Sequence, residues 1–302
     1  MAKKKTKRTT KRKGKKKGGS TFLSDLRQVI AWSLIAVISV FGITFFNDYY
    51  TPSEEKKAMS LPEQRHSEAR AELDEIPHDA EIPSLVKKKA EQIIRHTGFT
   101  VSYNSDYRIA NWVAYELTGE EASSNVTERS NKFVSDPKVK GTSAQNQDYT
   151  RSGYDRGHMA PAGDMKWSAR AMQESFYLSN ICPQDPKLNK GIWKDLEEQS
   201  RVWAKKHGAL YIVCGPVIDG ELKRLGKNRV GIPTHFYKVI CNPATNQAMG
   251  FVFENRDYRN RNLERYAIPV DSVEKVTGID FFPAFPDKVE RRMESVVEWS
   301  KW

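Results

Sequence analysis

The feature that most constrains the fold of this chain is a set of four short runs rich in β-branched and aromatic residues. They are WVAYEL (112–117), ALYIVCG (209–215), THFYKVIC (234–241) and AMGFVFEN (248–255). Each run has the length and composition of a β-strand. Three stretches of helical character occur in the same part of the chain, at 168–180, 191–208 and 286–299. Because few of these elements alternate in a βαβ pattern, we expect a fold of the α+β class.

The N-terminal part of the chain has a different composition. Residues 29–46 read VIAWSLIAVISVFGITFF, eighteen residues without a charge, which is near the lower limit of about 17–25 residues for a membrane-spanning helix. A strongly basic tail precedes this stretch and an acidic segment follows it. The positive-inside rule then predicts a single-pass membrane protein with a cytoplasmic N-terminus and a periplasmic or extracellular body.

The same composition shifts divide the chain into four predicted parts. These are a basic cytoplasmic tail (1–20), a membrane anchor helix (21–46), a flexible acidic linker (47–81) and a folded domain (82–302). A cleaved signal peptide is the alternative to the anchor. The apolar run is longer than the roughly 7–15 residues of a signal core, and no small-x-small cleavage site follows it. An uncleaved anchor that contacts the membrane through 29–46 is therefore favoured.

The net charge of +11 is concentrated at the N-terminus. The first twenty residues hold eleven Lys and Arg and no acidic residue, so the rest of the chain holds 38 basic and 38 acidic residues. Residues 85–302 hold 33 basic against 27 acidic residues. This mild excess agrees with a phosphate-binding groove but does not establish one.

Three cysteines, Cys182, Cys214 and Cys241, are widely spaced and form no CxxC pair. This spacing excludes zinc-ribbon and thioredoxin-like sites. Their neighbours are apolar or turn-forming residues, so we expect buried structural thiols.

Two segments hold most of the polar residues that folding alone does not explain. They are YDRGHMAP (154–161) and the stretch from SNICPQ to LNKGIW (179–193). Phosphodiester hydrolysis needs a base for the attacking water, and a neutral imidazole such as that of His158 suits this task near pH 7. The other five histidines have no comparable surroundings and are expected in the linker or on the surface: His66, His78, His96, His207 and His235.

The segments YDRGHMAPAGDM and YLSNICPQDPKLNKGIWKDLEEQSR resemble the DNA/RNA non-specific endonuclease family, over about residues 82–302. DRGH alone is a weak signal. Its combination with SN-x-x-PQ and LN-x-G-x-W at these spacings is specific. The resemblance implies a ββα-metal nuclease fold, with a central antiparallel sheet flanked by helices. It also implies an enzyme that hydrolyses DNA and RNA to 5′-phosphate products.

The resemblance assigns roles to individual residues. It makes His158 the general base and Asn189 the protein's ligand to Mg²⁺, with Mn²⁺ as a possible replacement. Glu197 matches a carboxylate that orients water on the metal. Asn189, Trp193 and Glu197 are spaced four residues apart and would share one face of a helix. Arg201 and Arg129 match arginines that contact the substrate phosphate. DNA and RNA would therefore be bound through their phosphate backbones.

Three further motif residues are expected to position the site. Asp155 and Arg156 lie beside the base in sequence and would orient its loop and imidazole. Asn180 would fix the active-site backbone or the ring of His158.

Each assignment has an alternative that involves no chemistry. Glu197 and Arg201 could form an ordinary surface pair on a helix. Asn180 could brace a turn, and Asp155 with Arg156 could form a local ion pair. At the level of function, the alternative is a non-catalytic, membrane-tethered module that binds nucleic acid. The sequence leaves the oligomeric state open.

Overall fold

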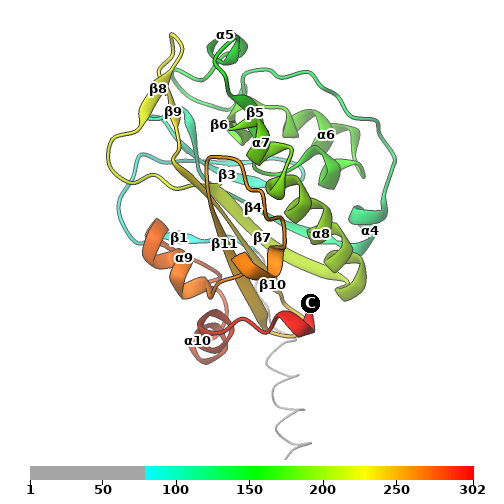
Figure 1. The fold of residues 1–302 in the computed structure, drawn as a ribbon. Coiled ribbons are helices and arrows are strands. Elements are labelled where there is room, and N and C mark those ends of the chain that lie inside the picture. Colours follow the sequence, from blue (N-terminus) through cyan, green and yellow to red (C-terminus); the bar gives the residue numbers. More distant parts are fainter. Residues whose placement is uncertain (1–78) are drawn as a thin grey trace, which may run out of the picture. The chain divides into compact units, whose positions relative to one another are not determined.

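A six-stranded sheet forms the centre of the computed structural model, which describes residues 79–302 (Figure 1). Every neighbouring pair of its strands is antiparallel. The strands, in their order across the sheet, are β11 (Gln247–Glu254), β10 (His235–Asn242), β7 (Ala209–Pro216), β4 (Ile109–Thr118), β3 (Thr100–Asn104) and β2 (Gln92–Arg95). The expected mixed fold with a central antiparallel sheet is thus confirmed.

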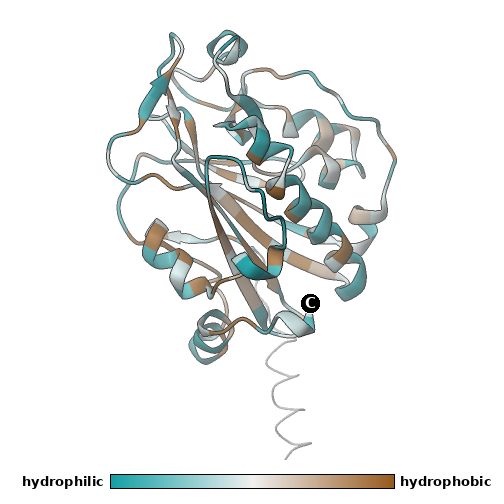
Figure 2. Ribbon diagram, in the orientation of Figure 1, coloured by the Kyte–Doolittle hydropathy of each residue, from teal (hydrophilic) through white to brown (hydrophobic). Residues whose placement is uncertain are grey.

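Both faces of this sheet are buried, and β4 shows how the sequence achieves this. Val113 and Tyr115 pack into one apolar cluster, while Trp112 and Ala114 pack into a second cluster on the opposite face. Successive side chains of a strand point to opposite faces, so an uninterrupted apolar run produces a strand covered on both sides. Figure 2 shows the hydrophobic colour concentrated along the central strands.

Helices α6 (Ala169–Ser175) and α8 (Ile192–His207) cover one face of the sheet. Ile192, Leu196 and Trp203 of α8 are buried in the first cluster. The helix ends at Gly208, whose φ of 93° belongs to a region that residues with a side chain rarely adopt. On the other face lie α9 (Val270–Thr277), α10 (Asp287–Ser295) and the two-stranded pair β1 (Ser84–Leu85) and β12 (Ile279–Asp280).

A small antiparallel pair precedes α8 and gives the ββα arrangement. It consists of β5 (Asp155–His158) and β6 (Ile181–Gln184), which pair from Asp155 with Gln184 to His158 with Ile181. The short helix α7 (Pro186–Asn189) then leads into α8. Asp185 caps α7 by accepting hydrogen bonds from the N–H groups of Lys187 and Leu188.

The remaining elements lie in the connections. They are α4 (Gly119–Ser123), α5 (Asn146–Tyr149), β8 (Lys223–Leu225), β9 (Val230–Ile232) and the 3₁₀ turns η1 (Ala162–Met165), η2 (Leu178–Asn180), η3 (Leu263–Tyr266) and η4 (Trp299–Lys301).

The four predicted strands and the helix at 191–208 occur as expected. The helix predicted at 168–180 ends at Ser175, and Leu178–Asn180 forms a separate 3₁₀ turn. At the break, the side chain of Asn180 donates to the carbonyl oxygen of Ser175 at 2.9 Å. The helix predicted at 286–299 also ends early, because Val296 adopts an extended conformation.

The predicted basic tail, the anchor helix at 21–46 and residues 47–78 of the linker lie outside the described residues. Within 79–302, no helix has both the length and the apolar composition needed to cross a bilayer. All three cysteines are buried and free, as expected.

Candidate active site

His158 is the last residue of β5, and its ring packs between two aromatic side chains. The ring centroids of Phe176 and Phe133 lie 4.8 and 5.4 Å from that of His158. The residue is 7% exposed, and its Nε2 has no hydrogen-bond partner among residues 79–302. A buried polar atom without an internal partner calls for an explanation, of which a catalytic role is one.

Burial lowers the pKa of His158 to about 3, and the positive charge of Arg129 acts in the same direction. Both effects disfavour the imidazolium form. At neutral pH the ring is therefore uncharged and can accept a proton from a molecule that enters the site.

Arg129 lies on the same side of the structure as the imidazole. Its guanidinium carbon is 5.1 Å from the centroid of the Phe176 ring, and its Nε donates to Asn131 Oδ1 at 2.9 Å. The residue is exposed, so its guanidinium can reach a ligand. Arg129 also acts electrostatically on Glu197.

Helix α8 connects the base to two more charged side chains. Trp193 Nε1 donates to the backbone carbonyl of His158 at 3.3 Å. One turn further on, burial raises the pKa of Glu197 to about 7, although the positive charge of Lys238 opposes the shift. Arg201 follows after another turn and donates from Nη1 to Asp164 Oδ1 at 2.7 Å. Glu197 and Arg201 thus do not form the surface ion pair that their spacing allows.

Asn189 ends α7 and does not belong to the helix that carries Glu197. Gly191 lies between the two helices with φ −101° and ψ −125°, outside helical geometry. The expectation of one shared helical face is therefore wrong. The Nδ2 of Asn189 donates to Asp155 Oδ2 at 3.0 Å. This bond uses the amide nitrogen and leaves the amide oxygen Oδ1 available to a cation.

Asp155 and Arg156 occupy different surroundings from those expected. Asp155 pairs with Lys190 at 2.7 Å as well as with Asn189. Arg156 donates to the side-chain and backbone oxygens of Asn146 at 2.9 and 2.8 Å, and its guanidinium lies over the ring of Phe133. Neither residue bonds to the imidazole, and the two do not pair with each other.

Asn180 holds the backbone immediately after the base. Its Oδ1 accepts from the N–H of Ala160 at 2.9 Å, and its Nδ2 donates to the carbonyl of Ala160 at 2.8 Å. The amide makes no contact with the ring of His158 itself. Arg129 acts electrostatically on both His158 and Glu197, and Arg201 acts on Glu197, so these four residues form one group. Asn189 contacts Asp155 at the start of β5.

A family model described as DNA/RNA non-specific endonuclease matches residues 77–288. This chain belongs to that family. Among similar proteins, mitochondrial Endonuclease G of Homo sapiens is 34% identical over 221 residues, covering 67% of this chain and 71% of the relative. Mitochondrial Nuclease EXOG of Danio rerio is 36% identical over 206 residues, covering 63% of this chain and 60% of the relative.

A similar solved structure is the crystal structure of the EndoG/EndoGI complex, which concerns the mechanism of EndoG inhibition. It has a TM-score of 0.62 and 32% sequence identity, and the match covers 66% of this chain and 88% of the other. Its fold agrees with the ββα-metal arrangement of β5, β6 and the following helices. Family membership makes this chain a hydrolase of the nuclease class within a group of metal-dependent enzymes.

The localisation expected from the sequence is wrong. A periplasmic or extracellular nuclease domain disagrees with the relatives, because Endonuclease G of Homo sapiens, Nuclease EXOG of Danio rerio and the Mitochondrial nuclease of Saccharomyces cerevisiae are all named as mitochondrial. The expectation rested on the composition of residues 1–46, which the family match does not include.

Sequence reasoning missed a group of buried charged residues next to the candidate site. Asp164 accepts from Tyr115 Oη at 2.9 Å as well as from Arg201. Lys238 is fully buried, 4.9 Å from the ring of Trp193, and its Nζ has no hydrogen-bond partner in the described structure. A lysine in the middle of the apolar run THFYKVIC was the available signal. Lys238 lies two residues from both Phe236 and Ile240 along β10, so its side chain points to the same face of the sheet, the one that α8 covers.

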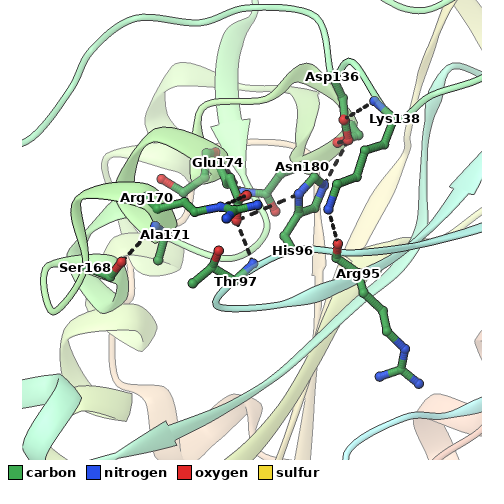
Figure 3. Close-up of polar contacts among 12 residues, drawn as sticks. Arg95, His96, Thr97, Asp136, Lys138, Ser168, Arg170, Ala171, Glu174 and Asn180 are labelled. Atoms are coloured by element: carbon green, nitrogen blue, oxygen red, sulfur yellow. Dashed lines mark hydrogen bonds and ion pairs between the residues drawn. The ribbon is translucent and has the colours of Figure 1, made fainter.

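The prediction that His96 lies on the surface is also wrong. Its side chain is 0% exposed, and Figure 3 shows the ring between Asp136 and Glu174. His96 Nε2 lies 2.9 Å from Asp136 Oδ2, which also accepts from Ser179 Oγ at 2.7 Å. Through Asp136, these contacts link His96, which follows β2, to Ser179 of η2, the residue before Asn180. His207 and His235 are partly exposed, whereas His66 and His78 lie outside 79–302.

Proposed function

We propose that this nuclease is a metal-dependent endonuclease that hydrolyses phosphodiester bonds of both DNA and RNA and leaves 5′-phosphate ends. The observation that carries the proposal is the neutral, internally unpartnered imidazole of His158 beside the cationic side chain of Arg129. A base and a phosphate-binding cation adjacent to each other match the needs of phosphodiester hydrolysis.

In the proposed mechanism His158 removes a proton from the water that attacks phosphorus. The lowered pKa of His158 means that the free ring carries no proton on its basic nitrogen at neutral pH. Glu197 orients water in the site, and Asn180 keeps the backbone that follows His158 in place through its two bonds to Ala160. The leaving group is the 3′-oxygen, so the phosphate stays on the 5′ side of the break.

Two arginines balance the charge of the phosphate. Arg129 is exposed and reaches outward over Phe176. Arg201 has a side chain that is 21% exposed and is held by Asp164. Burial alone would lower the pKa of Arg201, but the negative charge of Asp164 outweighs this effect and raises it. Burial lowers the pKa of Arg129, but a guanidinium group stays charged at neutral pH in proteins. Guanidinium groups can bind phosphate oxygens in a bidentate manner.

The residues present fit a hard divalent cation. Asn189 offers an amide oxygen, and Asp155 holds that amide in place through Nδ2, as outer residues often do for metal ligands. Mg²⁺ prefers oxygen ligands and retains several waters, so one side-chain oxygen can suffice, and Mn²⁺ can replace it. When bound, the ion would supply Lewis-acid stabilisation of the phosphate and of the leaving oxygen.

The proposed substrate range follows from the groups that face the site. The arginines recognise phosphates, which DNA and RNA share, and backbone contacts carry no information on base sequence. A protein inhibitor is a further partner class that we propose, since the similar solved structure is a complex in which EndoG is inhibited.

The test is cleavage of plasmid DNA and of RNA by the full-length chain in the presence of Mg²⁺. His158→Ala is expected to lower kcat by about 10²–10⁴-fold, which is the usual contribution of a general base. His235→Ala, which changes a partly exposed histidine on β10, is the matched control and should cleave normally. Near-wild-type cleavage by His158→Ala would defeat the proposal. Asn189→Ala should change the metal concentration required, and an unchanged requirement would place the ligand elsewhere.

The alternative is a module that binds nucleic acid without cleaving it. The presence of all the reactive side chains in one connected group argues against this alternative. It would be supported by salt-sensitive DNA binding without turnover at any Mg²⁺ or Mn²⁺ concentration.

A further inference from the structure

A second group of acidic side chains lies on the sheet face opposite to His158. Asp271 and Glu274 are three residues apart on α9, so they share one side of that helix. Glu290 and Glu294 are four residues apart on α10 and share a side in the same way. Both helices pack on the second apolar cluster, through residues such as Val273 and Met293. None of these carboxylates belongs to the motifs of the nuclease site.

The oxygens of three of these side chains are close enough to hold a single ion. One carboxylate oxygen from each of Asp271, Glu274 and Glu294 lies within 4.8 Å of the others. Oxygens bound to one Ca²⁺ at roughly 2.3–2.6 Å lie at most about 5 Å apart. The spacing thus suits three ligands around one such ion.

Glu294 provides an independent indication that this group binds a ligand. The residue is 4% exposed, and its Oε1 is buried without a hydrogen-bond partner anywhere in 79–302. A buried carboxylate is unfavourable unless it is protonated, paired or bound to a metal. Its unpartnered side chain belongs to the same group of oxygens as Asp271 and Glu274.

The largest influences on Glu294 all favour its protonated form. Burial and the charges of Glu274, Glu290, Asp280 and Asp271 all raise its pKa, to about 9. Glu274 receives one hydrogen bond, from the N–H of Phe281 at 2.9 Å, which leaves its other oxygen available.

Two cations act on the neighbouring carboxylates. Lys275 acts on Glu274, and Arg291 acts on Glu290 while pairing with Asp287 at 3.8 Å. Because the pKa of Glu294 is about 9, its side chain carries a proton at neutral pH. A bound cation would replace that proton among the three carboxylates.

We propose that Asp271, Glu274 and Glu294 bind one calcium ion that ties α9 to α10. Calcium is favoured over magnesium because it accepts several carboxylates in a flexible geometry, whereas magnesium retains most of its waters. The site is separate from the one at Asn189, since the two lie on opposite faces of the sheet. Its role is to stabilise the C-terminal helices rather than to take part in hydrolysis.

The test uses the full-length chain after chelation and removal of the chelator. Millimolar Ca²⁺ should raise Tm by about 5 °C or more once it exceeds Kd about 100-fold, and Mg²⁺ at the same concentration should raise it less. Metal analysis after gel filtration in Ca²⁺ should find one calcium ion at this site. Glu294→Gln should lose both the Tm response and the calcium, while its Tm in chelator should equal or exceed that of the wild type.

Two control variants separate this site from the nuclease site and from surface effects. Asn189→Ala should keep the calcium response, because its amide lies on the other face. Glu221→Gln, which changes an exposed carboxylate on another part of the surface, should also keep it. If Glu294→Gln fails to fold, Asp271→Asn at the partly exposed edge replaces it. The proposal would be overturned if the wild type and Glu294→Gln (or its replacement, Asp271→Asn) gave equal Tm responses to calcium, or if the wild type gave none.

Discussion

At the scale of single residues, the nuclease site depends on charges that lie beneath the surface. Lys238 and Asp164 are both fully buried, and each influences Glu197. Lys238 lowers the pKa of Glu197, whereas Asp164 raises it. Interactions of this kind are strong because little water screens them. The pKa of Glu197 therefore depends on buried charges as well as on its own burial.

Replacing Lys238 by methionine tests this arrangement. Lys238→Met keeps an unbranched side chain but removes the positive charge, so the pKa of Glu197 should rise above its value of about 7. A larger fraction of Glu197 is then protonated at pH 7, and kcat/KM should fall by about 10-fold there and recover as the pH rises. The measurement is the pH profile of kcat/KM for plasmid cleavage. Lys227→Met, on an exposed loop, should leave the pH profile unchanged. An unchanged profile in Lys238→Met would show that Lys238 does not set the pKa of Glu197.

At the scale of elements, the cluster around His96 joins segments that are distant in sequence. Asp136 accepts hydrogen bonds from Ser179 of η2 and from the backbone of Lys138, and it pairs with His96 at the end of β2. Burial alone would raise the pKa of Asp136, but these bonds lower it below its ordinary value of 3.8. The ionised form is thus stabilised in the folded state.

The lowered pKa of Asp136 gives a pH dependence with a definite sign. The group contributes stability above its unfolded pKa of about 4, and the contribution is lost as the pH falls through the lower, folded-state pKa. Asp136→Asn should therefore cost about 1–3 kcal/mol at pH 7, and the difference from the wild type should shrink below pH 4. Urea unfolding between pH 7 and pH 3 measures this difference in unfolding free energy. Asp219→Asn, at an exposed position, should show no such trend, and a pH-independent difference for Asp136→Asn would contradict the assignment.

Local patterns predicted most elements of this fold but not how distant ones meet. The strands were visible because β-branched and aromatic residues occur together, as in ALYIVCG. The burial of His96 was not visible, since its partner Asp136 is 40 residues away and Glu174 is further still. The break between Asn189 and α8 depended on the backbone conformation of Gly191, which a helical spacing rule does not include.

The candidate site, too, was predicted from the sequence only in part. The motif residues were found because their types and spacings are distinctive, and the roles proposed for them still rest on experiment. Lys238 lacked any motif, and only its place in an apolar strand distinguished it. Asp155 was assigned to the imidazole because it is close in sequence, but residues three apart in a strand point to opposite faces. It therefore meets Asn189 instead.

At the scale of the whole molecule, the side chains proposed to bind phosphate lie on one face of the sheet. Arg129 and Arg201 lie with the candidate nuclease site, whereas the carboxylates of α9 and α10 lie on the opposite face. We therefore expect nucleic acid to approach in the orientation that presents it to the two arginines. Each phosphate that a basic side chain neutralises releases counterions, so the binding affinity depends on salt concentration.

Arg129 provides a direct measure of this orientation. In a His158→Ala background, which prevents cleavage, Arg129→Ala should reduce the slope of log Kd against log salt concentration by about 1, as expected for one lost phosphate contact. Fluorescence anisotropy with a labelled DNA duplex gives the slope. Arg292→Ala removes the same charge from an exposed position on α10, on the opposite face, and should leave the slope unchanged. Equal effects of the two substitutions would mean that net charge alone attracts DNA, and the face bearing His158 would then have no special role in binding.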